Sequence, residues 1–276
     1  MKRTIGFGLF VAVAVITLAF LLLPIVGIFV HTSPGKVLGQ LSNPAVKDAF
    51  VVTLKTSVIA QALILLFGTP TAYLLATRRF PGHSVAITLV ELPLVLPPAV
   101  AGVGLLAALG REGLLGSSLS AFGVSLPFTQ AAVTVAVAYV ASPLYVRQAI
   151  ASFEATDPRL TAASRTLGAG PVRTFFRVVL PLARGGLIAG LALSFARGLG
   201  EFGATIMFAG SLQKVTQTLS LAIYAEFDVN FDATLAMGGV LVLISALLLL
   251  TLRIALTWQR SSSTRSPFLF GLSSSA

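Results

Sequence analysis

The sequence predicts an all-α polytopic membrane protein with about six transmembrane helices. Of its 276 residues, 56% are hydrophobic and only 10% are charged, whereas a typical soluble domain carries about 25% charged residues. The mean hydropathy is +0.94. The apolar residues form six segments, each long enough to cross a hydrocarbon core of about 30 Å, which takes roughly 20 residues. No strand pattern and no solenoid repeat interrupts them, so we expect one helical membrane domain.

The six expected spans occupy most of the chain. They run over 5–30, 50–76, 84–109, 129–150, 183–209 and 233–257. The first follows Met1-Lys2-Arg3, as the apolar part of a signal peptide would, but it exceeds the usual length of about 7–15 residues. No small-x-small cleavage site follows it cleanly. We therefore expect an uncleaved membrane helix there.

Lys and Arg are divided unevenly between the two sides of the expected spans. Thirteen lie on one side and four on the other, while Lys55 and Arg197 lie within spans. Because cytoplasmic loops carry the excess of Lys and Arg, we expect both termini in the cytoplasm. Arg147 is counted with the cytoplasmic side. The net charge of +10 then follows mainly from topology, and no basic patch with interleaved aromatic residues indicates nucleic-acid binding.

The sequence has none of the common signatures of catalysis or of metal binding. It contains no cysteine, no GxxxxGK[ST] phosphate loop, no His-Glu-x-x-His and no Ser nucleophile elbow. His31 and His83 stand alone in expected loops, and we assign neither a role. We therefore expect no catalytic residue, no cofactor and no metal, and a transporter with this sequence must take its energy from another protein.

The longest expected cytoplasmic segment lies between the fourth and fifth spans. Asp157-Pro158 predicts a helix start, with a capping Asp and Pro in the first turn, and Gly168 predicts its end. A second short helix is expected to begin at Gly170-Pro171 and to end at Pro181. Such a helix pair can lie on anionic lipid or dock a cytosolic partner in the helix-in-groove manner. The pattern alone leaves both open.

Two short stretches of this segment, "AASRTLG" and the following "VVLP", resemble the loop motif of bacterial ATP-binding-cassette (ABC) importer permeases. The resemblance implies that the segment couples the permease to an ATPase subunit. Ala162 stands where the motif has an acidic residue, so it cannot make the charge contact that this position implies, although Glu154 and Asp157 are nearby. The implied coupling residues are Ala162, Ala163, Ser164, Gly168, Val178, Leu180 and Pro181.

The resemblance extends from about residue 49 to 255. "ELPLVLPPAVAG", "YVASPLYVRQAIASFEATDPRL", "GEFGATIMFAG" and "TQTLSLAIY" are similar to segments of molybdate-importer permeases. Sulfate permeases, a sister group, also carry the Gly-Glu-Phe-Gly segment, and the Thr-Gln-Thr-Leu stretch favours molybdate. The resemblance implies a type I ABC importer permease fold. Its divisions would be an N-terminal helix with an external loop (1–48), a permease core (49–258) with a coupling loop at about 151–182, and a cytoplasmic Ser-rich tail (259–276).

The same resemblance implies the partners and the transport reaction. The partners would be two copies of an ATP-binding cassette subunit, an extracytoplasmic oxyanion-binding protein, a second copy of this chain and membrane lipid, with no nucleic acid. The cargo would be molybdate or tungstate, which the sequence does not separate. An ion-coupled secondary transporter remains an alternative. A membrane-embedded enzyme would require an approach of Glu91 to Glu201.

Two charged residues, Arg197 and Glu201, stand inside the fifth expected span. Four residues apart on a helix, their side chains can reach each other. Gly186, Gly190, Ser194 and Gly198 form a small-residue stripe beside them that lets another helix approach closely. We expect an ion pair at a helix seam or at the cavity. It either supports the helix structurally or lines the anion path, with Gly200 and Gly203 providing a flexible gate.

The third expected span combines Glu91 with Pro93, Pro97 and Pro98. Proline removes helical hydrogen bonds, so a kinked or broken helix is expected. Broken helices at membrane depth are tolerated where they line protein or a water-filled cavity. Glu91, Pro97 and Pro98 are therefore candidates for the translocation path, with a simple packing kink as the alternative.

Overall fold

The computed structural model describes residues 2–32, 34–40 and 42–263, and every regular element within these ranges is a helix. The first seven helices are α1 (Lys2–His31), α2 (Pro34–Gln40), α3 (Pro44–Thr77), α4 (His83–Val95), α5 (Pro98–Leu109), α6 (Gly116–Ala121) and α7 (Gln130–Glu154). The others are α8 (Pro158–Thr166), α9 (Pro171–Thr174), the π-helix η1 (Phe175–Val179), α10 (Leu180–Leu199), α11 (Gly203–Ala209), α12 (Leu219–Glu226) and α13 (Phe231–Ser263).

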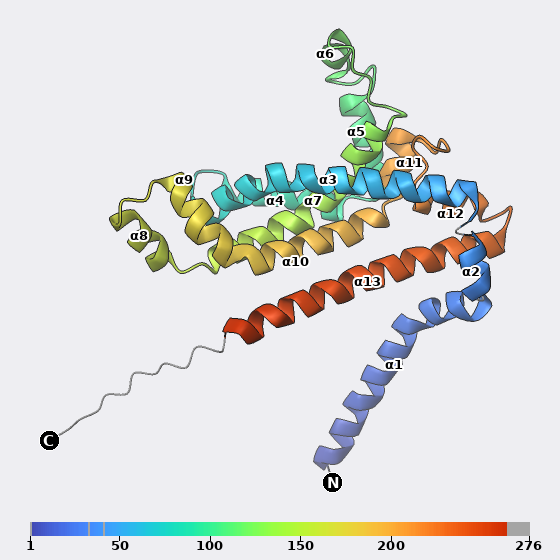
Figure 1. Ribbon diagram of the computed structural model, residues 1–276, viewed down its shortest axis with the longest axis horizontal. Coiled ribbons are helices and arrows are strands. Elements are labelled where there is room, and N and C mark those ends of the chain that lie inside the picture. Colours follow the sequence, from blue (N-terminus) through green and yellow to red (C-terminus); the bar gives the residue numbers. More distant parts are fainter. Residues whose placement is uncertain (1, 33, 41, 264–276) are drawn as a thin grey trace.

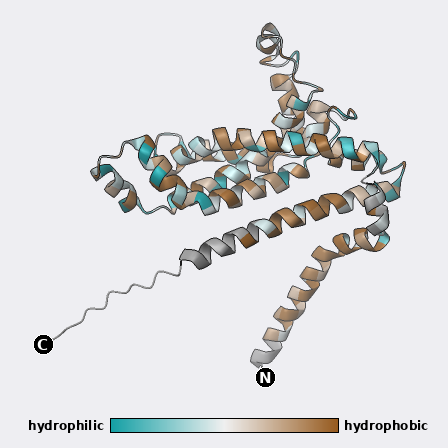
Figure 2. Cartoon of the chain, viewed as in Figure 1, coloured by the Kyte–Doolittle hydropathy of each residue, from teal (hydrophilic) through white to brown (hydrophobic). Residues whose placement is uncertain are grey.

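The predicted all-α membrane fold is confirmed. Within the described ranges, five helices are long and apolar enough to cross a membrane, or six if the bent pair α4–α5 is one span. Apolar residues cover the long helices, and hydrophilic residues gather around α8 and α9 at one end of the bundle (Figure 2). We call that end the coupling end.

Helix α7 lies at the centre of the bundle, packed between α3 and α10 (Figure 1). Its side chains Val133, Val137 and Tyr145 are fully buried. The Tyr145 hydroxyl lies 2.6 Å from Thr69 Oγ1 on α3, which gives this buried polar group a partner. The three helices therefore form a fixed frame for the shorter, broken helices around them.

The small-residue stripe on α10 forms a close helix seam, as expected. A Cβ atom on Gly190 would lie 2.9 Å from Gln148 Cβ, and one on Gly198 would lie 2.9 Å from Val137 Cγ1. Both distances are shorter than real Cβ contacts, so these positions must be glycine for α10 to approach α7 this closely. Within the stripe, Ser194 Oγ lies 3.2 Å from Gln61 Nε2 of α3.

The third expected span is broken, as the prolines predict. Helix α4 ends at Val95 and α5 begins at Pro98, and their axes are bent by 116°. As a result α5 and α6 project away from the long helices (Figure 1).

The fifth expected span differs from the prediction, because it is not one continuous helix. Helix α10 ends at Leu199, and α11 starts at Gly203 after a short break. Gly200, at the end of α10, has φ −88° and ψ 7°. Glu201 thus lies in the break rather than on the helix that carries Arg197.

The coupling segment confirms its expected start and corrects its expected end. Asp157 Oδ1 accepts the Arg159 N–H at 2.9 Å, and Gly168 has φ +81° just after α8. However, the prediction that Pro181 ends the second helix was wrong. The π-helix η1 joins α9 to α10, and Pro181 occupies the first turn of α10, where a missing N–H is tolerated.

Helix α1 diverges from the other helices (Figure 1). Near its C-terminal end, Ile28 and Phe29 approach Gly238 and Gly239 of α13. At the other end of the chain, residues 259–263 of the expected tail continue α13. The remaining part, 264–276, lies outside the described residues.

Candidate functional site

Arg197 and Glu201 form the expected ion pair. Arg197 Nη1 lies 2.8 Å from Glu201 Oε2, and the other carboxylate oxygen accepts the Ala204 N–H at 2.8 Å. The Glu201 side chain is 1% exposed, whereas that of Arg197 is 33% exposed. Glu201 thus uses one oxygen to cap the start of α11 and the other to hold the arginine.

The two helix breaks lie against each other. A Cβ atom on Gly203 would lie 2.7 Å from Pro98 Cβ, and one on Gly102 would lie 2.6 Å from the Ala204 carbonyl oxygen. Pro97 and Pro98 therefore start α5 beside the start of α11. The structure brings five of the path candidates together here: Pro97, Pro98, Arg197, Glu201 and Gly203. Gly200 lies in the same break, and a Cβ atom there would meet nothing within 4 Å.

This arrangement offers a partly exposed guanidinium between two broken helices. An arginine has five N–H donors in a planar fork that matches oxyanions, and Glu201 takes one of them in the described part of the chain. The remaining donors of this guanidinium could contact an oxyanion.

Glu91, the remaining path candidate, lies apart from this cluster and has a partner of its own. Its Oε1 lies 3.2 Å from Nε of Arg147 on α7. Arg147, which the charge count assigned to the cytoplasmic side, lies within the expected span 129–150, seven residues before the end of α7. Because Glu91 and Glu201 are each bound to a separate arginine, they do not form the carboxylate pair of a membrane-embedded enzyme.

The coupling candidates occupy the solvent-exposed end of the bundle. Ala162 and Ala163 are exposed on α8, and Ser164 Oγ lies 3.1 Å from Thr174 Oγ1, which ties α8 to α9. A Cβ atom on Gly168 would meet nothing within 4 Å. The remaining three residues continue into the span: Val178 in η1, then Leu180 and Pro181 at the start of α10.

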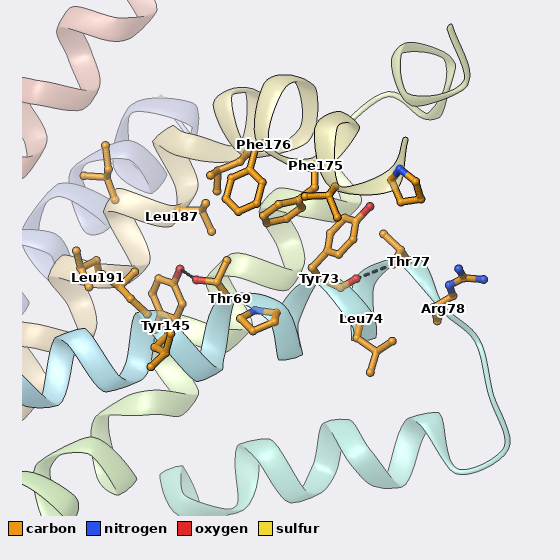
Figure 3. Close-up of a pocket in the computed structure, with 17 residues that line it drawn as sticks. Thr69, Tyr73, Leu74, Thr77, Arg78, Tyr145, Phe175, Phe176, Leu187 and Leu191 are labelled. Atoms are coloured by element: carbon orange, nitrogen blue, oxygen red, sulfur yellow. Dashed lines mark hydrogen bonds between the residues drawn. The ribbon is translucent and has the colours of Figure 1, made fainter. Parts of the chain in front are cut away.

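An aromatic cluster connects the coupling segment to the bundle. The Tyr73 ring of α3 lies 4.8 Å from that of Phe175 in η1 and 5.4 Å from that of Phe153 in α7, measured between centroids. Beside this cluster, α3, η1 and α10 line an apolar pocket of about 980 Å³, where Tyr73 and Phe175 lie together (Figure 3). These rings join η1 to both α3 and α7.

His83, to which the sequence analysis assigned no role, lies at the start of α4 and contacts two residues of the preceding segment. Its Nε2 lies 2.8 Å from the Leu75 carbonyl oxygen, and Arg79 Nη1 lies 3.2 Å from Nδ1. Arg79 Nη2 in turn lies 3.7 Å from Glu154 Oε1. This connection ties the α3–α4 turn to the end of α7, where the coupling segment begins. The sequence signal for this connection was the spacing of Arg79 and His83, which lie four positions apart on either side of Gly82.

The described residues contain no cluster of three or more His, Cys, Asp or Glu side chains that could hold a metal ion.

Known proteins share both the sequence and the fold of this chain. The family described as "Binding-protein-dependent transport system inner membrane component" matches residues 64–261. The molybdenum transport system permease protein ModB of Mycobacterium tuberculosis is 38% identical over 237 residues, which is 86% of this chain and 90% of that protein. The sulfate transport system permease protein CysT of Salmonella typhimurium is 38% identical over 215 residues, 77% of each chain.

The fold is that of a bacterial alginate ABC transporter solved in complex with an alginate-bound periplasmic protein. The two chains superpose with a TM-score of 0.69 at 16% identity, covering 91% of this chain and 93% of that one. The matched family covers most of the chain, including both helix breaks and the coupling segment. This protein is therefore a member of the binding-protein-dependent transport system inner membrane components, the permease subunits of ABC importers.

Proposed function

We propose that this permease translocates molybdate into the cytoplasm by ATP-driven alternating access. The observation that carries the substrate assignment is the similarity to molybdenum permeases, which are 38% to 47% identical to this chain, whereas the sulfate permeases are 37% to 38% identical. A partly exposed arginine between two broken helices is consistent with an anionic cargo. Tungstate shares the charge and nearly the size of molybdate, so it belongs to the same proposal.

Two copies of the chain would form the pathway, since closed two-fold oligomers are the commonest arrangement of identical subunits. An ATPase subunit would dock on each coupling segment, with α8 and Gly168 as the contact and the aromatic cluster as the connection to α3 and α7. An extracytoplasmic oxyanion-binding protein would deliver the cargo at the opposite end. The excess of Lys and Arg on the side of the coupling segment supports a cytoplasmic position of both termini.

The translocation path would pass the paired helix breaks. Arg197, Glu201, Gly200, Gly203, Pro97 and Pro98 would form its outer part, and Glu91 would lie nearer the cytoplasm. Separation or closure of the two breaks would gate the cavity. No step of this cycle requires chemistry on the cargo.

Uptake of labelled molybdate and labelled sulfate, with and without the gene in its native host, tests the substrate. Loss of molybdate uptake with sulfate uptake intact supports the proposal. Loss of sulfate or thiosulfate uptake alone makes the protein a sulfate permease, the second candidate, which the similarity to CysT favours. If neither changes in a host without a paralogue, the substrate assignment is wrong.

A further inference from the structure

The Glu91–Arg147 pair lies at membrane depth, yet much of it is uncovered in the single subunit. The side chains of Arg147 and Glu91 are 62% and 38% exposed. Arg147 lies seven residues, or about 10 Å, from the end of α7. The 25 residues of α7 span about 37 Å, so for a helix centred on a hydrocarbon core about 30 Å thick this position lies inside the edge nearer the coupling end.

Such a pair cannot face lipid tails without a large cost, so it faces water or protein. Ionisable residues in membrane spans almost always face the bundle interior or a water-filled cavity. The pair also closes the cytoplasmic half of the broken span onto α7, because Glu91 belongs to α4. The pair therefore forms a polar site between α4 and α7.

Much of the Arg147 side chain stays available, since it is 62% exposed. Its contact with Glu91 is made at Nε, and Arg147 has no hydrogen bond or ion pair with any other described residue, so its two terminal nitrogens are not shared with a second acidic side chain. These two nitrogens form the end-on fork that binds carboxylate or phosphate oxygens in a bidentate manner. A tetrahedral oxyanion can bind the same fork while Glu91 keeps Nε.

The Arg147 pair also lies at a different depth from the Arg197 pair. Gly198, next to Arg197, packs against Val137 of α7, ten residues before Arg147, which corresponds to roughly 15 Å along the helix. The path candidates therefore comprise two arginine–glutamate pairs at two depths. Conduction favours several weak sites, because an ion must be able to leave each of them.

We infer that Arg147, held by Glu91, is a second oxyanion-binding site, on the cytoplasmic side of the path. This inference rests on the proposed oxyanion transport and adds to it the site from which the cargo leaves. Glu91 fixes the orientation of the guanidinium, and its negative charge keeps anion binding weak enough for release.

The test is equilibrium binding of labelled molybdate and labelled sulfate to the purified permease–ATPase complex without nucleotide or binding protein. Arg147→Gln should weaken binding at least tenfold, because the fork and its charge are lost. Glu91→Gln should tighten it several-fold, because the amide oxygen can still hold Nε without its negative charge. Arg78→Gln, which removes an exposed arginine with no ion-pair partner among the described residues, should change nothing.

A purely structural ion pair would make both variants behave alike, and that result would overturn the inference. Its failure is distinguishable from failure of the proposed function. If the wild-type complex binds neither ion although it transports molybdate, the site does not exist and the function stands. If it binds sulfate alone with the opposite shifts in the two variants, the site stands and the molybdate assignment fails. Should Arg147→Gln not assemble, Glu91→Gln decides alone, since only an anion site predicts tighter binding.

Discussion

Glu201 Oε2 lies 2.8 Å from Arg197 Nη1, and the same carboxylate caps α11 through the Ala204 N–H. The pair thus spans the break between the helix that carries Arg197 and the helix that meets α5. It therefore fixes the start of α11 relative to α10, and α11 in turn packs against the start of α5.

Replacing Glu201 by Ala removes both of these contacts. The buried Ala204 N–H loses its acceptor, and an unsatisfied buried donor costs about 1–3 kcal/mol. We expect a lower melting temperature of the detergent-solubilised permease and loss of transport. Glu112→Ala is the control, because Glu112 is exposed in the loop before α6. Equal melting temperatures for the two variants would show that Glu201 does not hold the break.

Substitutions at Gly203 and Gly200 can distinguish a role in close packing from a role in backbone flexibility. A Cβ atom on Gly203 would lie 2.7 Å from Pro98 Cβ, whereas one on Gly200 would meet nothing within 4 Å. Overpacking of this kind costs about 1–3 kcal/mol. We expect Gly203→Ala to lower the melting temperature and the transport rate, and Gly200→Ala to leave both nearly unchanged. If Gly200→Ala impairs transport as strongly, a flexible hinge explains the site better than close packing.

Gly168 and Gly170 provide a similar comparison in the coupling segment. Both have open space around them, but Gly168 has φ +81° and Gly170 has φ −66°. A non-glycine residue in the left-handed region costs on the order of 1–3 kcal/mol. Gly168→Ala should therefore reduce ATP-dependent transport while the protein still inserts, and Gly170→Ala should not. Intact transport in a Gly168→Leu variant would favour an ion-coupled transporter.

Tyr73 should connect ATP hydrolysis to movement of the spans. Its ring contacts Phe175 and Phe153, and each aromatic pair adds about 0.5–1.5 kcal/mol beyond the burial of its surface. We expect Tyr73→Ala to retain ATP hydrolysis by the assembled complex and to lose transport per ATP hydrolysed. Phe80→Ala serves as the control, since Phe80 lies in the α3–α4 turn against His83. A proportional loss of both activities in Tyr73→Ala would indicate simple destabilisation.

Local signals in the sequence predicted much of the fold, and long-range partners were the part that could not be predicted. Asp157-Pro158, Gly168 and the prolines of the third span act through their own backbone, so their effects are visible in the sequence. The prediction that Pro181 ends a helix was wrong because η1 joins α9 to α10, and Pro181 lies in the first turn of α10. Arg197 and Glu201 were paired correctly since they are four residues apart, although the break between them was not expected.

The ion pair of Arg147 is the clearest example of a contact that could not be predicted from the sequence. Glu91 precedes it by 56 positions, and no local pattern connects the two residues. The charge count assigned Arg147 to the cytoplasmic side because it lies near the end of the expected span 129–150. Only the packing of α4 against α7 shows that the arginine has an acidic partner. Similarly, the contact of Gly203 with Pro98 depends on two breaks 105 positions apart.

The central claim is that this permease moves molybdate at the expense of ATP hydrolysed by a separate subunit. The most direct test is uptake of labelled molybdate by proteoliposomes that contain the permease and its ATPase, with the oxyanion-binding protein added outside. The account predicts accumulation above the external concentration only when both ATP and the binding protein are present. Accumulation without ATP, driven by an ion gradient, would contradict it.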